Sequence, residues 1–211
     1  MKKVAVLMDG GYARKVLNSW RYHQSPKPTI TADHLLALAE KCVDFAQNEE
    51  LFRIHFYDSW PYSGKQFDPL GGLQRDFSQE AFYSYHWNLF NELRQKPKVA
   101  FRAGQLKFRG WKLKDEAVKE LKANPRALIS SDFEPVLQQK GVDIKLGLDI
   151  STLASRRLVE KIVLFTADTD FIPVMKYARR QGVQVVYAFT SGSVHSDFAE
   201  HSDDVRQVPW P

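Results

Sequence analysis

Short apolar runs bounded by charged residues or glycine recur along the chain and predict buried strands. Residues 4–8 and 161–165 are two such runs, rich in β-branched residues and closely followed by aspartates. Because neither run alternates with polar residues, each is typical of a strand buried on both faces of a parallel sheet. A third run, residues 183–189, follows a helix-like stretch over residues 171–181 that ends at Gly182. Strand, helix and strand in this order predict a parallel βαβ unit.

Helical and strand-like patterns alternate through the rest of the chain. Apolar residues recur at helical spacing after Thr31, which is a suitable N-cap. We expect further strands at residues 51–57 and 99–103, a loop at 58–73, an aromatic-rich helix at 79–94 and helical structure at 136–157. Residues 104–136 lack a clear periodicity and predict a basic insertion or arm. The sequence therefore predicts one α/β domain over residues 1–211, with a central, mainly parallel sheet flanked by helices.

The amino-acid composition agrees with a single packed domain and indicates the cellular environment in which we expect it. A chain of 211 residues fits one domain that carries an insertion, and 44% hydrophobic residues are ample for a core. The one cysteine, Cys42, has no partner for an internal disulfide, so we expect a reducing, cytoplasmic setting. The apolar run before Asp9 holds only five residues, too few for a signal segment or a membrane span. We therefore expect no membrane association.

Charge is mildly basic overall and concentrated in one stretch. The net charge of +5 permits a polyanionic partner without requiring one. Residues 94–114 hold no acidic residue, and the rings of Phe101, Phe108 and Trp111 are interleaved with basic side chains. Because basic groups bind phosphates and rings stack on unpaired bases, the stretch favours a groove for single-stranded nucleic acid; the alternative is a solvated loop anchored by its aromatic residues. The candidate contacts are Arg102, Lys107, Arg109, Trp111 and Lys112.

Four aspartates lie where a parallel sheet gathers functional groups. Asp9 ends the first predicted strand, Asp168 and Asp170 follow the strand at 161–165, and Asp143 opens a helical segment. Because the carboxyl ends of parallel strands border one crevice, we expect these carboxylates to converge. Each also has a structural alternative, as a turn residue before two glycines, a helix cap or a solvated helix-start residue. Their joint placement favours a shared site.

A cluster of carboxylates has a direct chemical consequence. Packed carboxylates repel one another, and hard divalent cations that prefer oxygen ligands, Mg²⁺ or Mn²⁺, relieve the repulsion. The six histidines show no metal-ligand spacing, and no Cys/His cluster exists for zinc. A Walker-type phosphate loop and a dinucleotide fingerprint are both absent, which argues against a nucleotide cofactor. The sequence therefore predicts a magnesium or manganese site held by aspartates.

Three sequence motifs are highly specific when their order along the chain and their residues are taken together: VLMDGGY at residues 6–12, QKGVDIKLGLD at 139–149 and TADTDFIPV at 166–174. They resemble the NYN family of PIN-like nucleases, which includes the bacterial LabA-like proteins. Many family members have Asn shortly after the first Asp, where this chain has Gly11 and Tyr12. The resemblance implies a PIN-like fold in which Thr166 orients the metal shell by hydrogen bonding. The metal ligands that it implies are Asp9, Asp143, Asp168 and Asp170, with Asp149 as a weaker fifth carboxylate.

The activity implied by the resemblance is metal-dependent hydrolysis of RNA. We expect Asp9, Asp143, Asp168 and Asp170 to be catalytic, with metal-activated water attacking phosphorus in line and leaving a 5′-phosphate. The expected partner is single-stranded RNA, and Lys145 of the second stretch joins the candidate RNA contacts. The alternatives are a DNA nuclease or phosphatase with the same metal site, or an RNA-binding or regulatory NYN module without turnover. Oligomeric state and endo- or exonuclease action stay open at this point.

Overall fold

The computed structural model describes residues 1–210, in which helices and strands alternate along the chain. The strands are β1 (Lys2–Asp9), β2 (Glu49–Ser59), β3 (Lys65–Phe67), β4 (Gln74–Asp76), β5 (Val99–Leu113), β6 (Phe133–Lys140), β7 (Lys161–Phe165), β8 (Gln184–Phe189) and β9 (Asp204–Gln207). The helices are α1 (Gly10–Tyr22), α2 (Ala32–Glu40), α3 (Ala81–Leu93), α4 (Asp115–Ala123), α5 (Val142–Ser155), α6 (Ile172–Arg180) and α7 (Ser196–His201). Short 3₁₀ turns are η1 (Phe45–Gln47), η2 (Phe77–Gln79), η3 (Ser130–Asp132) and η4 (Thr169–Phe171).

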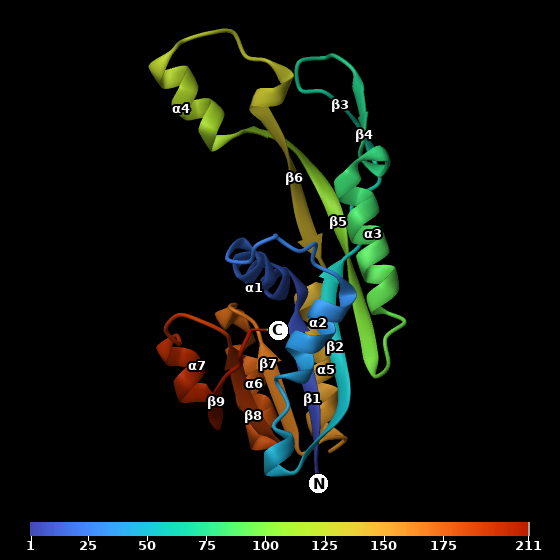
Figure 1. Ribbon diagram of the computed structural model, residues 1–211, viewed down its shortest axis with the longest axis vertical. Helices are drawn as coiled ribbons and strands as arrows, with labels where there is room; N and C mark the ends of the chain where they lie inside the picture. Colours follow the sequence, from blue (N-terminus) through green and yellow to red (C-terminus); the bar gives the residue numbers. More distant parts are fainter. Residues whose placement is uncertain (211) are drawn as a thin grey trace. The chain divides into compact units, whose positions relative to one another are not determined.

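Seven strands form one sheet in the order β6-β5-β2-β1-β7-β8-β9 (Figure 1). The pairs β1–β2, β1–β7, β7–β8 and β8–β9 are parallel, whereas β5 and β6 pair antiparallel. β3 and β4 form a separate two-stranded sheet. The predicted α/β class, with a mainly parallel sheet flanked by helices, is therefore confirmed.

The described chain divides into two compact units. Unit 1 consists of Met1–Asp58, Leu89–Ala103 and the residues from Gly141 onward, whereas unit 2 consists of Ser59–Asn88 and Gly104–Lys140. Helix α3 and strand β5 each contribute residues to both units. The stretch expected as a basic insertion, residues 104–136, belongs to unit 2 together with residues 59–88.

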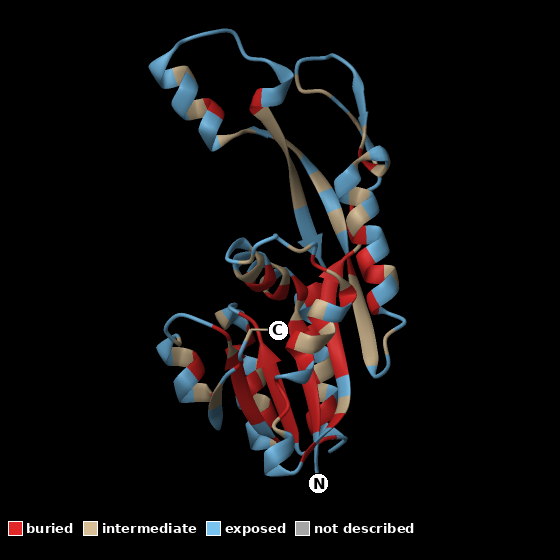
Figure 2. Cartoon of the chain, viewed as in Figure 1, coloured by how far each residue is buried: buried red, intermediate tan, exposed pale blue. Residues whose placement is uncertain are grey.

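The core of unit 1 is built on its two central strands, β1 and β7. Figure 2 shows these strands as buried, and Ala5, Leu7, Ile162 and Leu164 are fully inaccessible. Side chains alternate between the two faces of a strand, and these four pack with buried residues of α5 and α6. The intervening residues of both strands are equally buried, so apolar surface is covered on both faces. Continuous apolar runs, rather than alternating ones, follow from this double burial.

Two segments differ from the expected secondary structure. Residues 136–140, expected to be helical, belong to strand β6, and the helix begins only at Val142. The reason is non-local, because β6 is held by antiparallel pairing with β5, from Gln105 opposite Lys140 onward. Gly141 separates the two elements with a φ of 79°, a left-handed conformation that glycine adopts without steric cost. Residues 104–136 likewise contain regular structure, namely the rest of β5, helix α4 and the start of β6.

Helix α1 was not predicted, because its sequence opens on two glycines, which disfavour helix formation. In the structure Asp9 caps this helix, and Ala13, Val16 and Leu17 bury one of its faces. None of the helices within residues 1–210 combines the length and the apolar character needed to cross a membrane.

Candidate active site

Asp9 joins the end of β1 to the start of α1. Its Oδ1 accepts a hydrogen bond from the backbone N–H of Tyr12 at 3.1 Å, which makes it the N-cap of the helix. Its Oδ2 accepts a second hydrogen bond from the Thr166 hydroxyl at 3.1 Å. The next residue, Gly10, is packed so closely that it has no room for a side chain: a Cβ there would lie 2.6 Å from both Asp58 Oδ2 and the Tyr57 carbonyl oxygen. Asp9 therefore has a structural role as a helix cap rather than in the turn considered for it, and its second oxygen is held by the residue that follows β7.

Thr166 links the two strands that carry the candidate carboxylates. The residue directly follows β7 and is fully buried. Its hydroxyl donates to Asp9 and accepts a hydrogen bond from the backbone N–H of Asp168 at 3.1 Å. Asp168 in turn accepts from the backbone N–H of Asp170 at 2.9 Å and caps the turn η4. The orienting hydrogen bonds expected of Thr166 are therefore present, as is the capping role considered for Asp168.

Asp143 lies in the first turn of α5 and is exposed. The partial burial of its carboxyl group raises the pKa, and the negative charges of Asp168, Asp9 and Asp170 raise it further. All four aspartates belong to unit 1. The structure therefore brings Asp143 within electrostatic range of the other three carboxylates, although they come from three separate parts of the sequence.

These four residues suit a hard divalent cation. The donors are carboxylate oxygens, the ligands that Mg²⁺ and Mn²⁺ prefer, and their mutual repulsion would be relieved by positive charge. Within residues 1–210, no three Asp, Glu, His or Cys side chains already stand as a preassembled metal shell. Because Asp143, Asp168 and Asp170 are exposed, their side chains have room to turn toward an ion.

Asp149 occupies different surroundings from those expected of a fifth metal ligand. Its carboxylate accepts hydrogen bonds from Arg102 Nε and Nη2, both at 2.7 Å, and from the Tyr57 hydroxyl at 2.8 Å. His55 Nδ1 lies 3.6 Å away. Burial alone would raise the pKa of Asp149, but these groups outweigh it and lower the pKa. Asp149 is also not among the charges that act on Asp143, so the structure presents it as the anchor of an ion pair.

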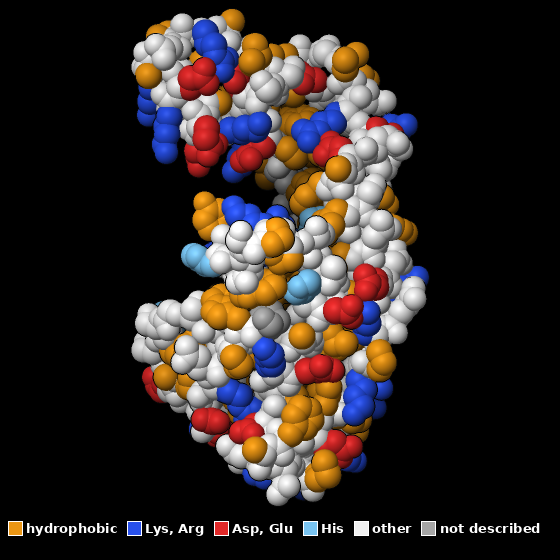
Figure 3. Space-filling view, in the orientation of Figure 1, with side chains coloured by type: hydrophobic (Ala, Val, Ile, Leu, Met, Phe, Trp, Pro, Cys, Tyr) orange, Lys and Arg blue, Asp and Glu red, His pale blue; other side chains and the backbone are white. Residues whose placement is uncertain are grey.

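The expected RNA contacts fall into two groups. Arg102 and Lys145 belong to unit 1 and are engaged there, Arg102 by Asp149 and Lys145 Nζ by the Ala103 carbonyl oxygen. The other four lie on β5 in unit 2: Lys107 is exposed, Arg109 Nε donates to Gln138 at 2.8 Å, Lys112 pairs with Glu134 at 2.9 Å and Trp111 Nε1 donates to the Phe67 carbonyl at 2.9 Å. On the face drawn in Figure 3, acidic and basic side chains are interspersed.

Sequence reasoning missed a buried ion pair beside the candidate site. Asp58, at the end of β2, is 2% exposed and accepts hydrogen bonds from Arg14 at 2.8 and 3.2 Å. The neighbouring residue Tyr57 pairs with Asp9 in the sheet, so Asp58 lies at the same edge. Its signal was the same as that of Asp9, an aspartate directly after an apolar run, but the run was followed by a glycine- and proline-rich stretch. Asp58 was therefore assigned to the loop.

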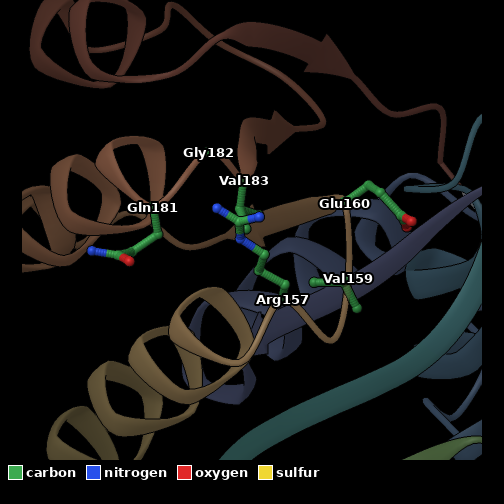
Figure 4. A pocket seen from close by; sticks show the side chains of 6 residues that line it. All are labelled: Arg157, Val159, Glu160, Gln181, Gly182 and Val183. Carbon is green, nitrogen blue, oxygen red and sulfur yellow. The ribbon is translucent and has the colours of Figure 1, made fainter.

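The opposite edge of the sheet in unit 1 holds a separate hollow of about 370 Å³. Figure 4 shows the six residues that line it: Arg157, Val159, Glu160, Gln181, Gly182 and Val183. They follow the carboxyl ends of α5 and α6 and precede β7 and β8. The four aspartates instead lie at the carboxyl end of β1, after the carboxyl end of β7 or at the start of α5. This hollow therefore does not belong to the carboxylate site.

Known proteins give the family. The chain matches the NYN domain over residues 3–207. A 60-residue stretch, 28% of the chain, is 30% identical to "Uncharacterized protein MJ0482" of Methanocaldococcus jannaschii and spans only 25% of that relative's length. The crystal structure of "a protein of unknown function VPA0982" from Vibrio parahaemolyticus aligns with 97% of this chain and 91% of its own, with a TM-score of 0.47 and 13% identity. Because the NYN match covers nearly the whole chain, the protein belongs to the NYN domain family.

Proposed function

We propose that this protein is a metal-dependent ribonuclease whose ion, Mg²⁺ or Mn²⁺, is held by Asp9, Asp143, Asp168 and Asp170. The observation that carries the proposal is the pair of Thr166 hydrogen bonds that joins Asp9 to the turn bearing Asp168 and Asp170. Asp143 lies close enough for the charges of these three carboxylates to add to the rise in its pKa that burial causes. A cluster of like charges is unfavourable without a counterion and becomes favourable with one. The NYN domain supports this assignment, because it implies the PIN-like nuclease superfamily, whose members typically use divalent metals.

The residues of the chain have separable tasks in this proposal. When bound, a divalent ion would activate water and stabilise charge on the phosphoryl group. The Thr166 hydroxyl holds Asp9 Oδ2, and its bond to the Asp168 N–H fixes the turn that carries Asp168 and Asp170. Asp143 approaches from another element, the first turn of α5. Metal ligands oriented by hydrogen bonds in this way bind more tightly than freely rotating ones.

Asp149 supports the site indirectly. Through Arg102 and Tyr57 it fastens α5 to β5 and β2, while Lys145 of the same helix binds the Ala103 carbonyl of β5. Both contacts lie within two turns of Asp143, which is on α5. We assign Asp149 to positioning Asp143 rather than to binding the ion.

Metal titration separates these two roles. Asp143→Asn should weaken Mn²⁺ binding markedly, because it removes a ligand charge, whereas Asp149→Asn should leave Mn²⁺ affinity within a few-fold of the wild type. Asp149→Asn should instead lower stability by about 1–2 kcal/mol, since it weakens charge-assisted hydrogen bonds. Isothermal titration with Mn²⁺ and thermal unfolding of both variants measure these effects. Equal losses of Mn²⁺ affinity in the two variants would show that Asp149 is a metal ligand after all.

The expected substrate is single-stranded RNA, bound in part by the basic face of β5. Lys107 and Arg109 are exposed there, and neither forms an ion pair within residues 1–210. Phosphates therefore have cationic partners that are not already neutralised.

Cleavage of labelled oligonucleotides tests the proposal. The wild-type protein should cut single-stranded RNA with Mg²⁺ or Mn²⁺ and stop when the metal is chelated. A DNA strand of the same sequence and a small phosphate monoester, supplied in parallel, distinguish a DNA nuclease or phosphatase from a ribonuclease. Tight RNA binding without any cleavage in either metal would instead identify a binding module that does not turn over.

A further inference from the structure

Unit 2 contains a pocket that the carboxylate site does not use. It has a volume of about 350 Å³, and its lining residues come from the segment after β2 and from the start of β5. They are Trp60, Pro61, Tyr62, Ser63, Gly64, Gly104, Gln105 and Leu106. Every one of these residues is uncharged, so the pocket does not suit a phosphate group or a metal ion. Its two large rings and its few polar groups suit a flat, neutral, partly polar ligand instead.

Both rings are held in place by their neighbours. The Trp60 ring lies 4.9 Å from the Trp87 ring, which stacks on Tyr83 at 5.8 Å and an interplanar angle of 14°. The Tyr62 hydroxyl accepts a hydrogen bond from Gln66 at 2.6 Å, and its ring stacks near Phe108 at 6.1 Å. Rings that are already ordered lose little entropy when a ligand stacks on them.

Glycine and polar groups complete the lining. A Cβ at position 64 would overlap the Tyr62 ring, so any larger residue there would displace this ring. Ser63 and Gln105, whose side chains carry hydrogen-bond donors and acceptors, are also among the lining residues. Hydrogen-bonding groups beside stacked aromatic rings are the combination that binds the edge and face of an unpaired nucleobase.

The pocket reaches the basic face of β5 through Gln105. Alternation along the strand places Gln105 on the same face as exposed Lys107 and Arg109. Leu106 lies on the other face with Phe108, which the Tyr62 ring contacts, so the pocket spans the edge of the strand. The residue paired with Gln105 in β6 is another exposed cation, Lys140. A strand whose base enters the pocket would therefore meet positive charge along its phosphates. An apolar peptide would not require this charge, so the surroundings favour a nucleic acid.

We infer that this pocket binds one unpaired base of single-stranded RNA against Trp60 and Tyr62, with the flanking phosphates along Lys107 and Arg109. The inference rests on the proposed function for the choice of RNA as ligand. It assigns a second contact point, in unit 2, that selects unpaired substrate independently of the carboxylates. Stacking tolerates any base, so the pocket selects single strands rather than a sequence.

Binding without metal tests the pocket apart from cleavage. In chelator, Trp60→Leu should bind a short labelled RNA about tenfold more weakly than the wild type, because one stacking contact is lost. Trp60→Phe should retain most of the affinity, since phenylalanine keeps a ring. Phe82→Leu is the matched control: Phe82 is a 59% exposed aromatic of unit 2 outside the pocket, and its loss should leave affinity unchanged.

An abasic oligonucleotide of equal length and charge completes the design. The wild type should bind it more weakly than RNA, and Trp60→Leu should bind the two with nearly equal affinity. A folded Trp60→Leu that binds RNA like the wild type, or a wild type that does not prefer RNA to the abasic strand, would overturn the inference. Neither result touches metal-dependent cleavage by the wild type, and a lack of cleavage with base-dependent binding intact would refute only the proposed ribonuclease activity.

Discussion

Asp168→Asn should reduce metal-dependent RNA cleavage by more than about a hundredfold, beyond the 10–100-fold typical of groups that merely support metal ligands. The substitution removes the charge that attracts a divalent ion and keeps the size of the side chain. Asp168 also caps the turn η4 by accepting from the Asp170 N–H at 2.9 Å, and asparagine caps nearly as well. The fold and RNA affinity should therefore survive, and unfolding without metal should occur at the same temperature or slightly higher, because carboxylate repulsion is reduced.

Asp44 offers a matched control for this experiment. It caps another 3₁₀ turn, η1, by accepting from the backbone N–H groups of Ala46 and Gln47 at 3.1 and 3.3 Å. Asp44→Asn should match Asp168→Asn in its small effect on stability and leave cleavage unchanged. Melting temperature, RNA affinity and cleavage rate are measured on all three proteins. Undiminished cleavage in Asp168→Asn, or a large loss of stability with unchanged activity per folded molecule, would show that Asp168 is only a cap.

Glu49→Gln should cost about 3–5 kcal/mol of folding stability, the largest effect expected of a single substitution here. The Glu49 side chain is fully buried and forms ion pairs with Lys161 and, at 2.8 Å, with Arg206. These cations are only 8% and 12% exposed, so removing the carboxylate leaves two largely buried cations without their counter-charge. The triad ties β2 to β7 and β9, which brings together three separate parts of the sheet.

The pH dependence gives this prediction a second signature. Burial alone would raise the pKa of Glu49, but hydrogen bonds from Arg206 and Lys161 hold it at about 2, below the ordinary value of 4.5. A carboxyl group with a lowered pKa stabilises the fold fully above its unfolded pKa and loses this contribution as pH falls through its folded pKa. The difference between wild type and variant should therefore be constant near neutral pH and shrink between pH 4.5 and about 2.

Denaturant unfolding at several pH values measures this difference. Glu50→Gln serves as the control, because Glu50 is the exposed neighbour in the same strand, and surface substitutions usually change stability by less than about 0.5 kcal/mol. Equal stability of Glu49→Gln and Glu50→Gln at neutral pH would contradict a stabilising role of the triad.

Local patterns in the sequence were sufficient for the sheet class, and they also led to the predicted carboxylate site. β1 and β7 were predicted because residues buried on both faces of a parallel sheet form continuous apolar runs. Asp9, Asp168 and Asp170 were proposed as site residues because Asp9 directly follows such a run and the other two lie within five residues of the next one. The fold class alone implies that strand ends share an edge. These signals are carried by neighbouring residues, so they need no knowledge of the partners across the fold.

Only the tertiary structure decided which distant residues and segments contact one another. Asp149 looks like the other aspartates in sequence, yet its carboxylate is taken by Arg102, 47 positions away. Residues 136–140 look helical by themselves but form β6, since pairing with β5 outweighs a weak local preference. The pocket of unit 2 likewise joins residues 60–64 to residues 104–106. Ion pairs, strand pairing and pockets depend on which distant segments meet, and residue type and periodicity along the chain do not contain that information.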